Sequence, residues 1–243
     1  HLHVNAIHAR RGVLHRRVIQ TSRFAAGVEC NKSAAWFKVF ITEDSRRDNI
    51  THRKDLGVEA MVSLQPPLCD FGWKARDFNL LGVDGIRYNL ANARGKNGLL
   101  VMFICNHCPY VKSIRDRIVR DTHELQQHGI NTIAIMSNDP SDYAEDSFDN
   151  MRSIAQQYAY PFPYVIDETQ QIAKDYDAVC TPDFFGFNAN LELQYRGRLD
   201  ASRKEAVADA SRDLFNAMLK VAQTGQGPRE QIASMGCSIK WKT

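Results

Sequence analysis

Two cysteines, Cys105 and Cys108, are the residues of this sequence best suited to redox chemistry. They follow the apolar run 99–104, which is typical of a buried strand, and they precede Pro109 and an amphipathic segment. Two thiols three positions apart at the start of a helix can close a disulfide with little backbone movement. The free N–H groups and the positive end of the helix dipole also stabilise a thiolate there. The pattern therefore predicts a redox-active dithiol.

Different roles are expected for the two thiols. Cys105, at the start of the helix, is the expected nucleophile and should have an exposed sulfur, whereas Cys108 lies one turn further in and should be more buried. Attack of the Cys105 thiolate on a disulfide gives a mixed disulfide, which Cys108 then resolves. His107 lies between them, and a cationic imidazole there would lower the pKa of Cys105. The alternative is a solvent-facing histidine with little effect on the thiol.

The other four cysteines are scattered along the chain, at positions 30, 69, 180 and 237. This distribution is unlike a disulfide-dense secreted scaffold and favours a reduced compartment with one working dithiol. Cys237 is a candidate additional redox residue, because a mobile tail could bring it to Cys105 or Cys108; the alternative is an unpaired tail thiol. A zinc site would need Cys180 and Cys237 as further ligands. No second tight cysteine pair is present, so no metal is expected.

The composition is that of an ordinary soluble protein, with 44% hydrophobic and 24% charged residues in 243 positions. A net charge of +3 is too small to indicate a nucleic-acid partner. No apolar stretch reaches the roughly 20 residues that span a bilayer, so no membrane association is expected. The expected location is the cytoplasm.

Residues 1–60 show no sustained hydrophobic period and are expected to be an extension that is disordered, a targeting segment or non-native. The stretch 1–28 contains five arginines and no acidic residue. Such a segment can be an organelle transit peptide, which would direct the protein to a mitochondrion or plastid. The alternative is a fragment, or an upstream stretch read in frame, with Met61 as the natural start.

Strand and helix patterns alternate over the rest of the chain, which predicts an α/β fold. The expected strands are a pair around the turn Asp84–Gly85, then 99–104, 130–136, 164–166 and a hairpin of 184–187 with 191–196. The expected helices follow the dithiol and cover about 147–158, 169–176 and 203–222. The acidic stretch 139–149 is expected to be a solvated loop that borders a substrate groove.

This order of elements resembles the thioredoxin fold, and it is most similar to the redoxins of the AhpC/TSA (alkyl hydroperoxide reductase/thiol-specific antioxidant) family. The resemblance covers about residues 61–243 and rests on the segments 72–78 with 83–85, 105–110, 167–176, Thr181–Pro182 and 236–241. It implies a three-layer α/β/α fold with a central mixed sheet, a redoxin-type N-terminal hairpin and an insertion before a cis-proline loop. The expected domain spans 61–222, followed by a loose C-terminal tail over 223–243 that contains Cys237.

The resemblance also implies a function, thiol–disulfide exchange by Cys105 and Cys108 without any cofactor. Thr181 and Pro182 correspond to the cis-proline loop, which in the family lies against the dithiol, pairs with the incoming substrate strand and keeps metals away. They are therefore candidate substrate-binding residues. The implied partners are protein disulfides or dithiols, or an electron donor such as a thioredoxin-type reductant.

Two alternative functions stay open at this point. One is a thiol peroxidase that reduces hydroperoxides at Cys105, although Met102 stands where peroxidases of the family carry a threonine. The other is a copper-binding metallochaperone of the thioredoxin fold. Such carriers place three residues between their cysteines and use a distant histidine, neither of which matches this sequence well.

Overall fold

The computed structural model describes residues 63–243 of the chain. The extension predicted over residues 1–60, with Cys30, lies outside the described residues. The boundary predicted between residues 222 and 223 stays a prediction. None of the described helices is both long enough and apolar enough to cross a membrane.

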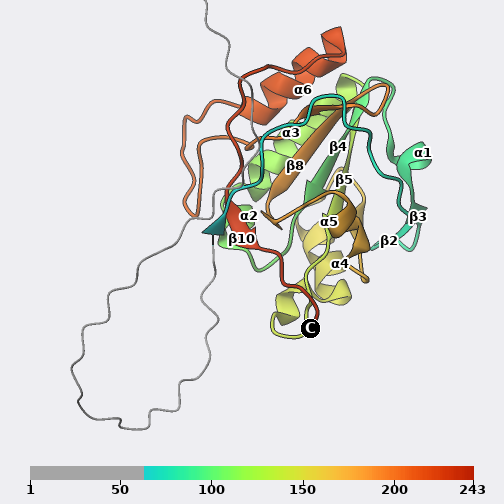
Figure 1. The fold of residues 1–243 in the computed structure, drawn as a ribbon. Coiled ribbons are helices and arrows are strands. Elements are labelled where there is room, and N and C mark those ends of the chain that lie inside the picture. The colour runs from blue at the N-terminus through green and yellow to red at the C-terminus, as the bar shows by residue number, and fades with distance from the viewer. Residues whose placement is uncertain (1–62) are drawn as a thin grey trace, which may run out of the picture. The chain divides into compact units, whose positions relative to one another are not determined.

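The described residues form ten strands and seven helical segments (Figure 1). The strands are β1 (Ser63–Leu64), β2 (Leu80–Gly82), β3 (Arg87–Tyr88), β4 (Gly98–Phe103), β5 (Ile130–Met136), β6 (Tyr164–Ile166), β7 (Cys180–Thr181), β8 (Asp183–Asn188), β9 (Leu193–Tyr195) and β10 (Gly236–Ser238). The helices are α1 (Leu90–Ala93), α2 (Pro109–Lys112), α3 (Arg115–Gln127), the 3-10 helix η1 (Ala144–Asp146), α4 (Phe148–Gln157), α5 (Gln171–Asp175) and α6 (Asp213–Thr224).

Seven of these strands form a mixed sheet in the order β3-β2-β6-β5-β4-β8-β9. The strands β4, β5 and β6 run parallel, whereas β8 lies antiparallel to β4 and β2 lies antiparallel to β6. The predicted N-terminal hairpin is present as β2 and β3, and the hairpin after the Thr–Pro pair is present as β8 and β9. The α/β class and the mixed central sheet are therefore confirmed.

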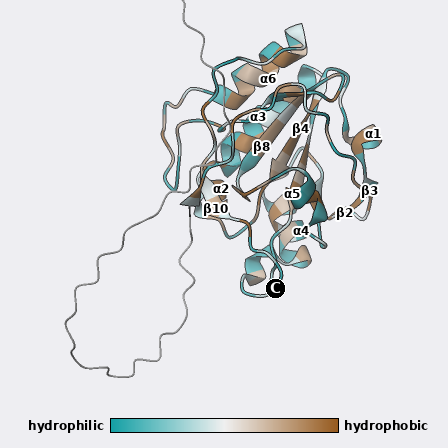
Figure 2. Cartoon of the chain, in the orientation of Figure 1, coloured by the Kyte–Doolittle hydropathy of each residue, from teal (hydrophilic) through white to brown (hydrophobic). Residues whose placement is uncertain are grey.

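Strand β4 lies inside the sheet, between β5 and β8, and every one of its six residues is buried. Its side chains alternate between two apolar clusters, with Leu100 and Met102 in one and Val101 and Phe103 in the other. Helices α3, α4 and α6 contribute to the first cluster, and α1 and α5 contribute to the second. Figure 2 shows the hydrophobic colouring of these central strands. The sheet is therefore covered by helices on both faces, which is the predicted three-layer arrangement.

The long helix predicted from residue 203 begins ten residues later, at Asp213 in α6. Residues 203–209 are exposed, and the side chain of Val207 has 44% of its surface accessible. Apolar residues at helical spacing therefore do not make a helix here, because this part of the chain has no surface against which to bury them. Asp213 in the first turn of α6 complements the helix dipole where the helix does begin.

The C-terminal tail is not loose, which corrects the prediction. Residues Gly236–Ser238 form β10, which pairs antiparallel with β1 on one side and with β7 on the other. Gly236 allows this pairing, because a Cβ at that position would lie 2.0 Å from the carbonyl oxygen of Thr181. A three-residue strand leaves too short a pattern to recognise in the sequence, and its order comes from the pairing with distant segments.

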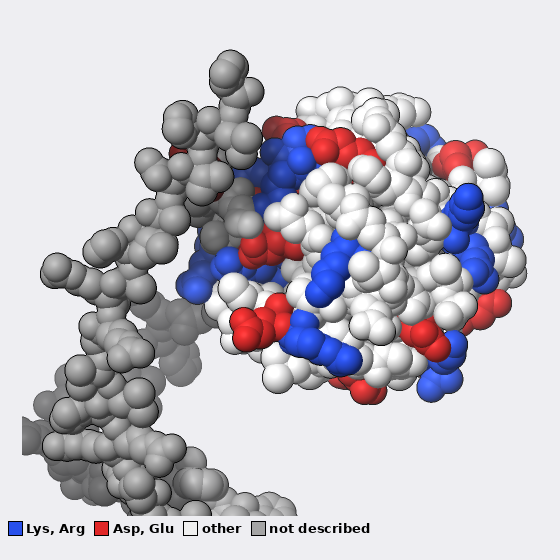
Figure 3. Space-filling view, turned by 90° about the horizontal axis from the view of Figure 1, so that it is seen from above, with Lys and Arg blue, Asp and Glu red and all other residues white. Residues whose placement is uncertain are grey.

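The surface charge agrees with the small net charge of the sequence. On the face seen in Figure 3, acidic and basic side chains are interspersed over a largely uncharged surface.

Candidate dithiol site

The two cysteines lie where the sequence predicts them, between the end of β4 and the start of α2. Cys108 has extended backbone angles and caps α2, and Pro109 is the first helical residue. Proline suits that position because its fixed φ matches the helix and its missing N–H is not needed there. The short turn over Cys105–Cys108 therefore presents both sulfurs at the carboxyl end of a central strand.

The structure gathers three sulfur atoms at this point rather than two. The Sγ atoms of Cys108 and Cys237 are 3.1 Å apart. A side-chain hydrogen bond also joins Cys108 to Cys105. Cys237 belongs to β10, so the fold places it beside the pair. Cys108 is the sulfur that contacts both of the others. Cys237 is a candidate redox residue from the sequence, but the sequence predicts it on a mobile tail and not in a fixed contact.

Both thiols of the predicted pair are enclosed. The exposed fraction is 1% for Cys105 and 0% for Cys108, so the expected exposure of the Cys105 sulfur is wrong for this conformation. Thr181 covers the pair from the cis-proline loop, with its Oγ1 atom 3.3 Å from the Cys105 Sγ and its carbonyl oxygen 3.1 Å from the Cys108 Sγ. The local pattern cannot show this enclosure, because Thr181 is more than 70 residues away in the chain.

The cis-proline loop has the predicted geometry, since the peptide bond between Thr181 and Pro182 is cis. The loop is brought against the dithiol through the hydroxyl and carbonyl groups of Thr181. The substrate-binding roles of Thr181 and Pro182 stay predictions.

The electrostatics of the pair differ from the expectation. Burial raises the pKa of the Cys105 thiol well above its ordinary value, and the hydrogen bond to Cys108 and the negative charge of Asp146 raise it further. Burial raises the pKa of Cys108 as well, but hydrogen bonds from Cys105, from Cys237 and from the backbone of Val111 outweigh it and hold that pKa below the ordinary value. The expected low pKa at Cys105 is thus corrected.

Two proton positions follow from these contacts. With the proton on Cys105, the Cys108 thiolate accepts the surrounding hydrogen bonds. With the proton on Cys108, that thiol donates a hydrogen bond to the carbonyl oxygen of Thr181, and the Cys105 thiolate can accept one from the Thr181 hydroxyl. The direct hydrogen bond between the two thiols connects these states. The pair can therefore move one negative charge between its sulfurs without solvent.

His107 is buried, which excludes the solvent-facing alternative in this conformation. Its Nδ1 atom is 2.6 Å from Oδ2 of Asp146 and 3.6 Å from the Sγ of Cys105, and its ring stacks on Tyr143 with 3.9 Å between centroids. Asp146 is fully buried and also accepts hydrogen bonds from the backbone N–H groups of Asn106 and His107. This carboxylate thus fixes the shape of the turn that carries the cysteines.

Asp146 is not predicted as a site residue from the sequence, because this residue lies in the acidic stretch predicted to be a solvated loop. Most of its acidic neighbours are indeed exposed, and only the fold distinguishes Asp146 from them. No signal in one sequence separates a buried acid from several exposed ones in the same loop.

Replacing His107 with alanine is expected to slow the alkylation of Cys105 at neutral pH. The substitution leaves the Asp146 carboxylate uncompensated beside the thiol, and a nearby negative charge raises a thiol pKa. The measurement is the pH dependence of the iodoacetamide rate in a Cys108→Ser background, so that Cys105 alone reports from the pair. An unchanged pH profile would reject this role for His107.

A second buried carboxylate follows the cis-proline loop. Asp183 lies 3.1 Å from the guanidinium of Arg196, and burial raises its pKa to about 7 despite the opposing effect of that arginine. The folded state then holds a proton on Asp183 that the unfolded chain, with a pKa near 3.8, has already lost. Stability from this group is therefore present at low pH and is lost as the pH rises from about 4 to about 7.

Replacing Asp183 with asparagine is expected to remove this pH dependence. Relative to the variant, the natural chain should lose up to about 1.4 kcal/mol of unfolding free energy for each pH unit within the window. Urea unfolding at several pH values from 4 to 8 gives both slopes. The slopes are the quantity to compare, because asparagine also changes the pairing of Arg196. Equal slopes would show that Asp183 is ionised throughout.

Among residues 63–243, one group of side chains offers three potential metal ligands in one place. The ligand atoms of Cys105, His107 and Asp146 lie within 4.8 Å of one another. Here, however, the imidazole and the carboxylate are hydrogen-bonded to each other. Cys180 does not extend this group toward the zinc site considered above. It precedes Thr181 in β7, so its side chain points to the opposite face of the strand, and its thiol donates to the carbonyl oxygen of Pro182.

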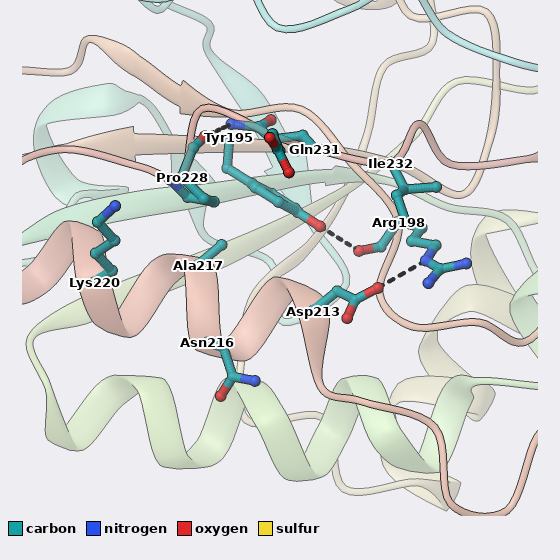
Figure 4. A pocket seen from close by; sticks show the side chains of 10 residues that line it. Tyr195, Arg198, Asp213, Asn216, Ala217, Lys220, Pro228, Gln231 and Ile232 are labelled. Atoms are coloured by element: carbon teal, nitrogen blue, oxygen red, sulfur yellow. Dashed lines mark hydrogen bonds and ion pairs between the residues drawn. The ribbon is translucent and has the colours of Figure 1, made fainter. Parts of the chain in front are cut away.

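A separate cavity of about 450 Å³ lies between α6 and the segment 228–232 (Figure 4). Tyr195, Arg198 and Asp213 line it, and the guanidinium of Arg198 donates to the Asp213 carboxylate at 2.7 Å. None of the three clustered cysteines borders this cavity. This cavity is therefore separate from the dithiol, whose two cysteines are 1% and 0% exposed.

Comparison with known proteins agrees with this architecture. The crystal structure of an uncharacterised conserved protein from Geobacillus kaustophilus is 40% identical, covers 75% of this chain and 98% of its own, and superposes with a TM-score of 0.71. A hypothetical protein from Sinorhizobium meliloti 1021 is 34% identical, covers 74% of this chain and 98% of its own, and gives a TM-score of 0.70.

A more distant structure shares the thioredoxin-like fold alone. It is a proposed protein disulfide isomerase from Bacteroides thetaiotaomicron, 13% identical, which covers 65% of this chain and 95% of its own with a TM-score of 0.50. A search of curated proteins gives no match. Residues 71–198 match the AhpC/TSA family. With this match and two relatives above 30% identity, the chain belongs to the AhpC/TSA family.

Proposed function

We propose that this protein is a thiol–disulfide oxidoreductase in which Cys105 and Cys108 exchange electrons with protein disulfides or dithiols. The family and the thioredoxin-like fold point to an oxidoreductase. One observation carries the finer proposal. The sulfurs of Cys105 and Cys108, between β4 and α2, both contact Thr181, the residue immediately before the cis proline. This arrangement holds the two thiols close enough to form a disulfide and to share one proton.

In the proposed reaction, Cys105 first transfers its proton to the Cys108 thiolate through the hydrogen bond between them. The Cys105 thiolate then attacks a substrate disulfide, forms a mixed disulfide and releases one substrate thiolate. Cys108 passes its proton to a leaving thiolate and attacks the Cys105 sulfur. The enzyme ends with one internal disulfide, and the substrate ends with one thiol and one thiolate, so electrons, protons and charge balance.

The neighbouring residues have positioning roles in this proposal. The Thr181 hydroxyl donates to the Cys105 thiolate, and the Thr181 carbonyl oxygen accepts a hydrogen bond from the protonated Cys108 during the attack. His107 and Asp146 hold the turn in shape, and the imidazole reduces the influence of the Asp146 charge on Cys105. The thiols supply all the chemistry, so the reaction requires no cofactor or metal.

The test is the reduction potential of the pair together with its activity on a disulfide substrate. Equilibration with glutathione buffers gives the potential, and insulin reduction with dithiothreitol as electron donor gives the activity. A potential of about −270 mV would indicate a reductant, and one of about −120 mV would indicate an oxidant. Failure of Cys105 and Cys108 to form a disulfide in any of these buffers would overturn the proposal.

A thiol peroxidase is the second candidate, and one contact favours it. The threonine that the family's peroxidases place three residues before the reactive cysteine is Met102 here, but Thr181 supplies a hydroxyl 3.3 Å from the Cys105 Sγ. Stopped-flow mixing of the reduced protein with hydrogen peroxide separates the two functions. Oxidation of Cys105 no faster than that of free cysteine would exclude the peroxidase.

A further inference from the structure

We propose that Cys237 is a third member of the redox site, and that it exchanges with the Cys105–Cys108 disulfide to form a Cys108–Cys237 disulfide. This inference rests on the proposed function, because the exchange begins from the internal disulfide of that reaction. It extends that function, because the oxidised protein then has two disulfide isomers, one between Cys105 and Cys108 and one between Cys108 and Cys237.

The sulfur geometry supports Cys108 as the shared partner. The Sγ of Cys237 lies 3.1 Å from that of Cys108, and both residues are buried, at 1% and 0% exposure. Cys105 contacts Cys108 through the other thiol–thiol hydrogen bond. Thiol–disulfide exchange requires an attacking, a central and a leaving sulfur. The structure provides those three sulfurs within one cluster, with Cys108 contacting both neighbours.

The fold holds Cys237 in this position by backbone pairing. In β10, Cys237 faces Ser63 of β1 on one side and Thr181 of β7 on the other. The close approach of Gly236 to Thr181 fixes the spacing of these strands. The pairing with β7 continues beyond Ser238, because the backbone N–H of Ile239 donates to the carbonyl oxygen of Val179 at 3.2 Å. The contact between the sulfurs is therefore part of the folded structure and not a chance encounter of a tail.

The exchange needs no external oxidant or reductant. The Cys237 thiol first loses its proton, for which a leaving thiolate of the preceding step is the acceptor. Its thiolate attacks the Cys108 sulfur of the Cys105–Cys108 disulfide. A bond forms between the sulfurs of Cys108 and Cys237, the original disulfide breaks, and Cys105 leaves as a thiolate. One disulfide is present before and after, so the oxidation state is unchanged.

The isomerisation has a functional consequence at Cys105. After the exchange, the oxidised protein again carries a thiolate at the position of the nucleophile, beside the Thr181 hydroxyl. Because β10 occupies the edge of β7, the same exchange also ties the C-terminal strand to the dithiol covalently. The second isomer therefore combines a locked β10 with a reactive Cys105.

Peptide mapping of the full chain tests the proposal. After oxidation with diamide and blocking of the remaining thiols with N-ethylmaleimide, trypsin releases residues 97–112, which contain both cysteines of the pair, and residues 230–240, which contain Cys237. A Cys105–Cys108 disulfide stays within one peptide, whereas a Cys108–Cys237 disulfide links the two. We expect both products from the natural chain, with the linked peptide appearing after the internal disulfide.

Serine variants assign the bond. Cys105→Ser should form the linked peptide as its main disulfide, and adding Cys237→Ser should abolish it. Cys69→Ser is the matched control and should leave the linked peptide at full yield, because Cys69 lies outside the cluster and burial raises its pKa to about 11. Gly236→Ala keeps every sulfur but forces β10 away from Thr181, so it should sharply reduce the yield of the linked peptide.

The outcomes separate this inference from the proposed function. If the natural chain forms only the internal disulfide, the inference is overturned and the proposed function stands. If Cys108→Ser links the two peptides as well as Cys105→Ser does, Cys108 is not the shared sulfur and the inference is again overturned. If neither disulfide forms in the natural chain, the proposed function itself fails.

Discussion

Replacing either Cys105 or Cys108 with serine is expected to reduce the turnover of disulfide exchange on the order of a hundredfold or more. A serine hydroxyl neither ionises near neutral pH nor forms a disulfide, so the cycle stops at a different step in each variant. Cys105→Ser should form no mixed disulfide at residue 105, whereas Cys108→Ser should accumulate one that it cannot resolve. Insulin reduction gives the turnover, and mass spectrometry of the trapped complex identifies the cysteine.

The choice of nucleophile is the part of this prediction that the structure puts to the sharpest test. The hydrogen bonds around Cys108 hold its pKa low, while that of Cys105 is raised, so attack by Cys105 depends on proton transfer between them. Cys69→Ser serves as the control and should keep the natural turnover. If Cys105→Ser retained most of the activity and trapped substrate at residue 108, the two roles would have to be exchanged.

Replacing Asp146 with alanine is expected to lower the free energy of unfolding by about 3–5 kcal/mol. The carboxylate is fully buried and accepts from the N–H groups of Asn106 and His107, from the His107 ring and from the side chain of Asn138, at 2.6–3.1 Å. Removing it leaves these donors buried without an acceptor. Urea unfolding measures the loss as a lower midpoint with an unchanged slope.

Two further variants show whether the loss comes from the buried hydrogen bonds. Asp146→Asn keeps one acceptor oxygen and should cost about half as much. Asp149→Ala removes an acid from the same stretch whose side chain is 91% exposed and pairs with Arg152, so it should change the stability by less than about 1 kcal/mol. Equal effects of the Asp146 and Asp149 alanine variants would show that Asp146 does not support the turn.

Asp146 is expected to affect disulfide exchange as well as stability, because it contacts the turn over Cys105–Cys108. Asp146 shapes the backbone that carries Asn106 and His107, and those residues stand between the two cysteines. Asp146→Ala should therefore also slow exchange at temperatures where the protein remains folded. If folded Asp146→Ala exchanged disulfides at the rate of the unsubstituted protein, Asp146 would contribute to stability and not to exchange.

The features predicted correctly share a local origin. The apolar run of β4, the spacing of Cys105 and Cys108, and Pro109 lie within a dozen residues, so the strand, the dithiol and the helix start can be read from neighbouring positions. The hairpin of β2 and β3 is likewise defined by its own turn. Such patterns depend on side-chain periods and turn residues, which act over a few positions.

The features that sequence analysis misses depend on contacts between distant segments. Asp146 meets the cysteine turn across about 40 residues, and Cys237 meets Cys108 across 129. The start of α6 is a similar case, because spacing alone favours residue 203, whereas burial against the sheet begins only near Asp213.

By itself, the sequence determined the α/β class, the dithiol and its place between strand and helix, because these follow from residues close together in the chain. Only the tertiary structure decided that both thiols are buried, that Asp146 holds their turn and that Cys237 contacts Cys108. Burial and charge at the sulfurs are set by groups from β7, η1 and β10, which folding alone brings together. The thiol pKa values depend on those neighbours and not on the spacing of the cysteines.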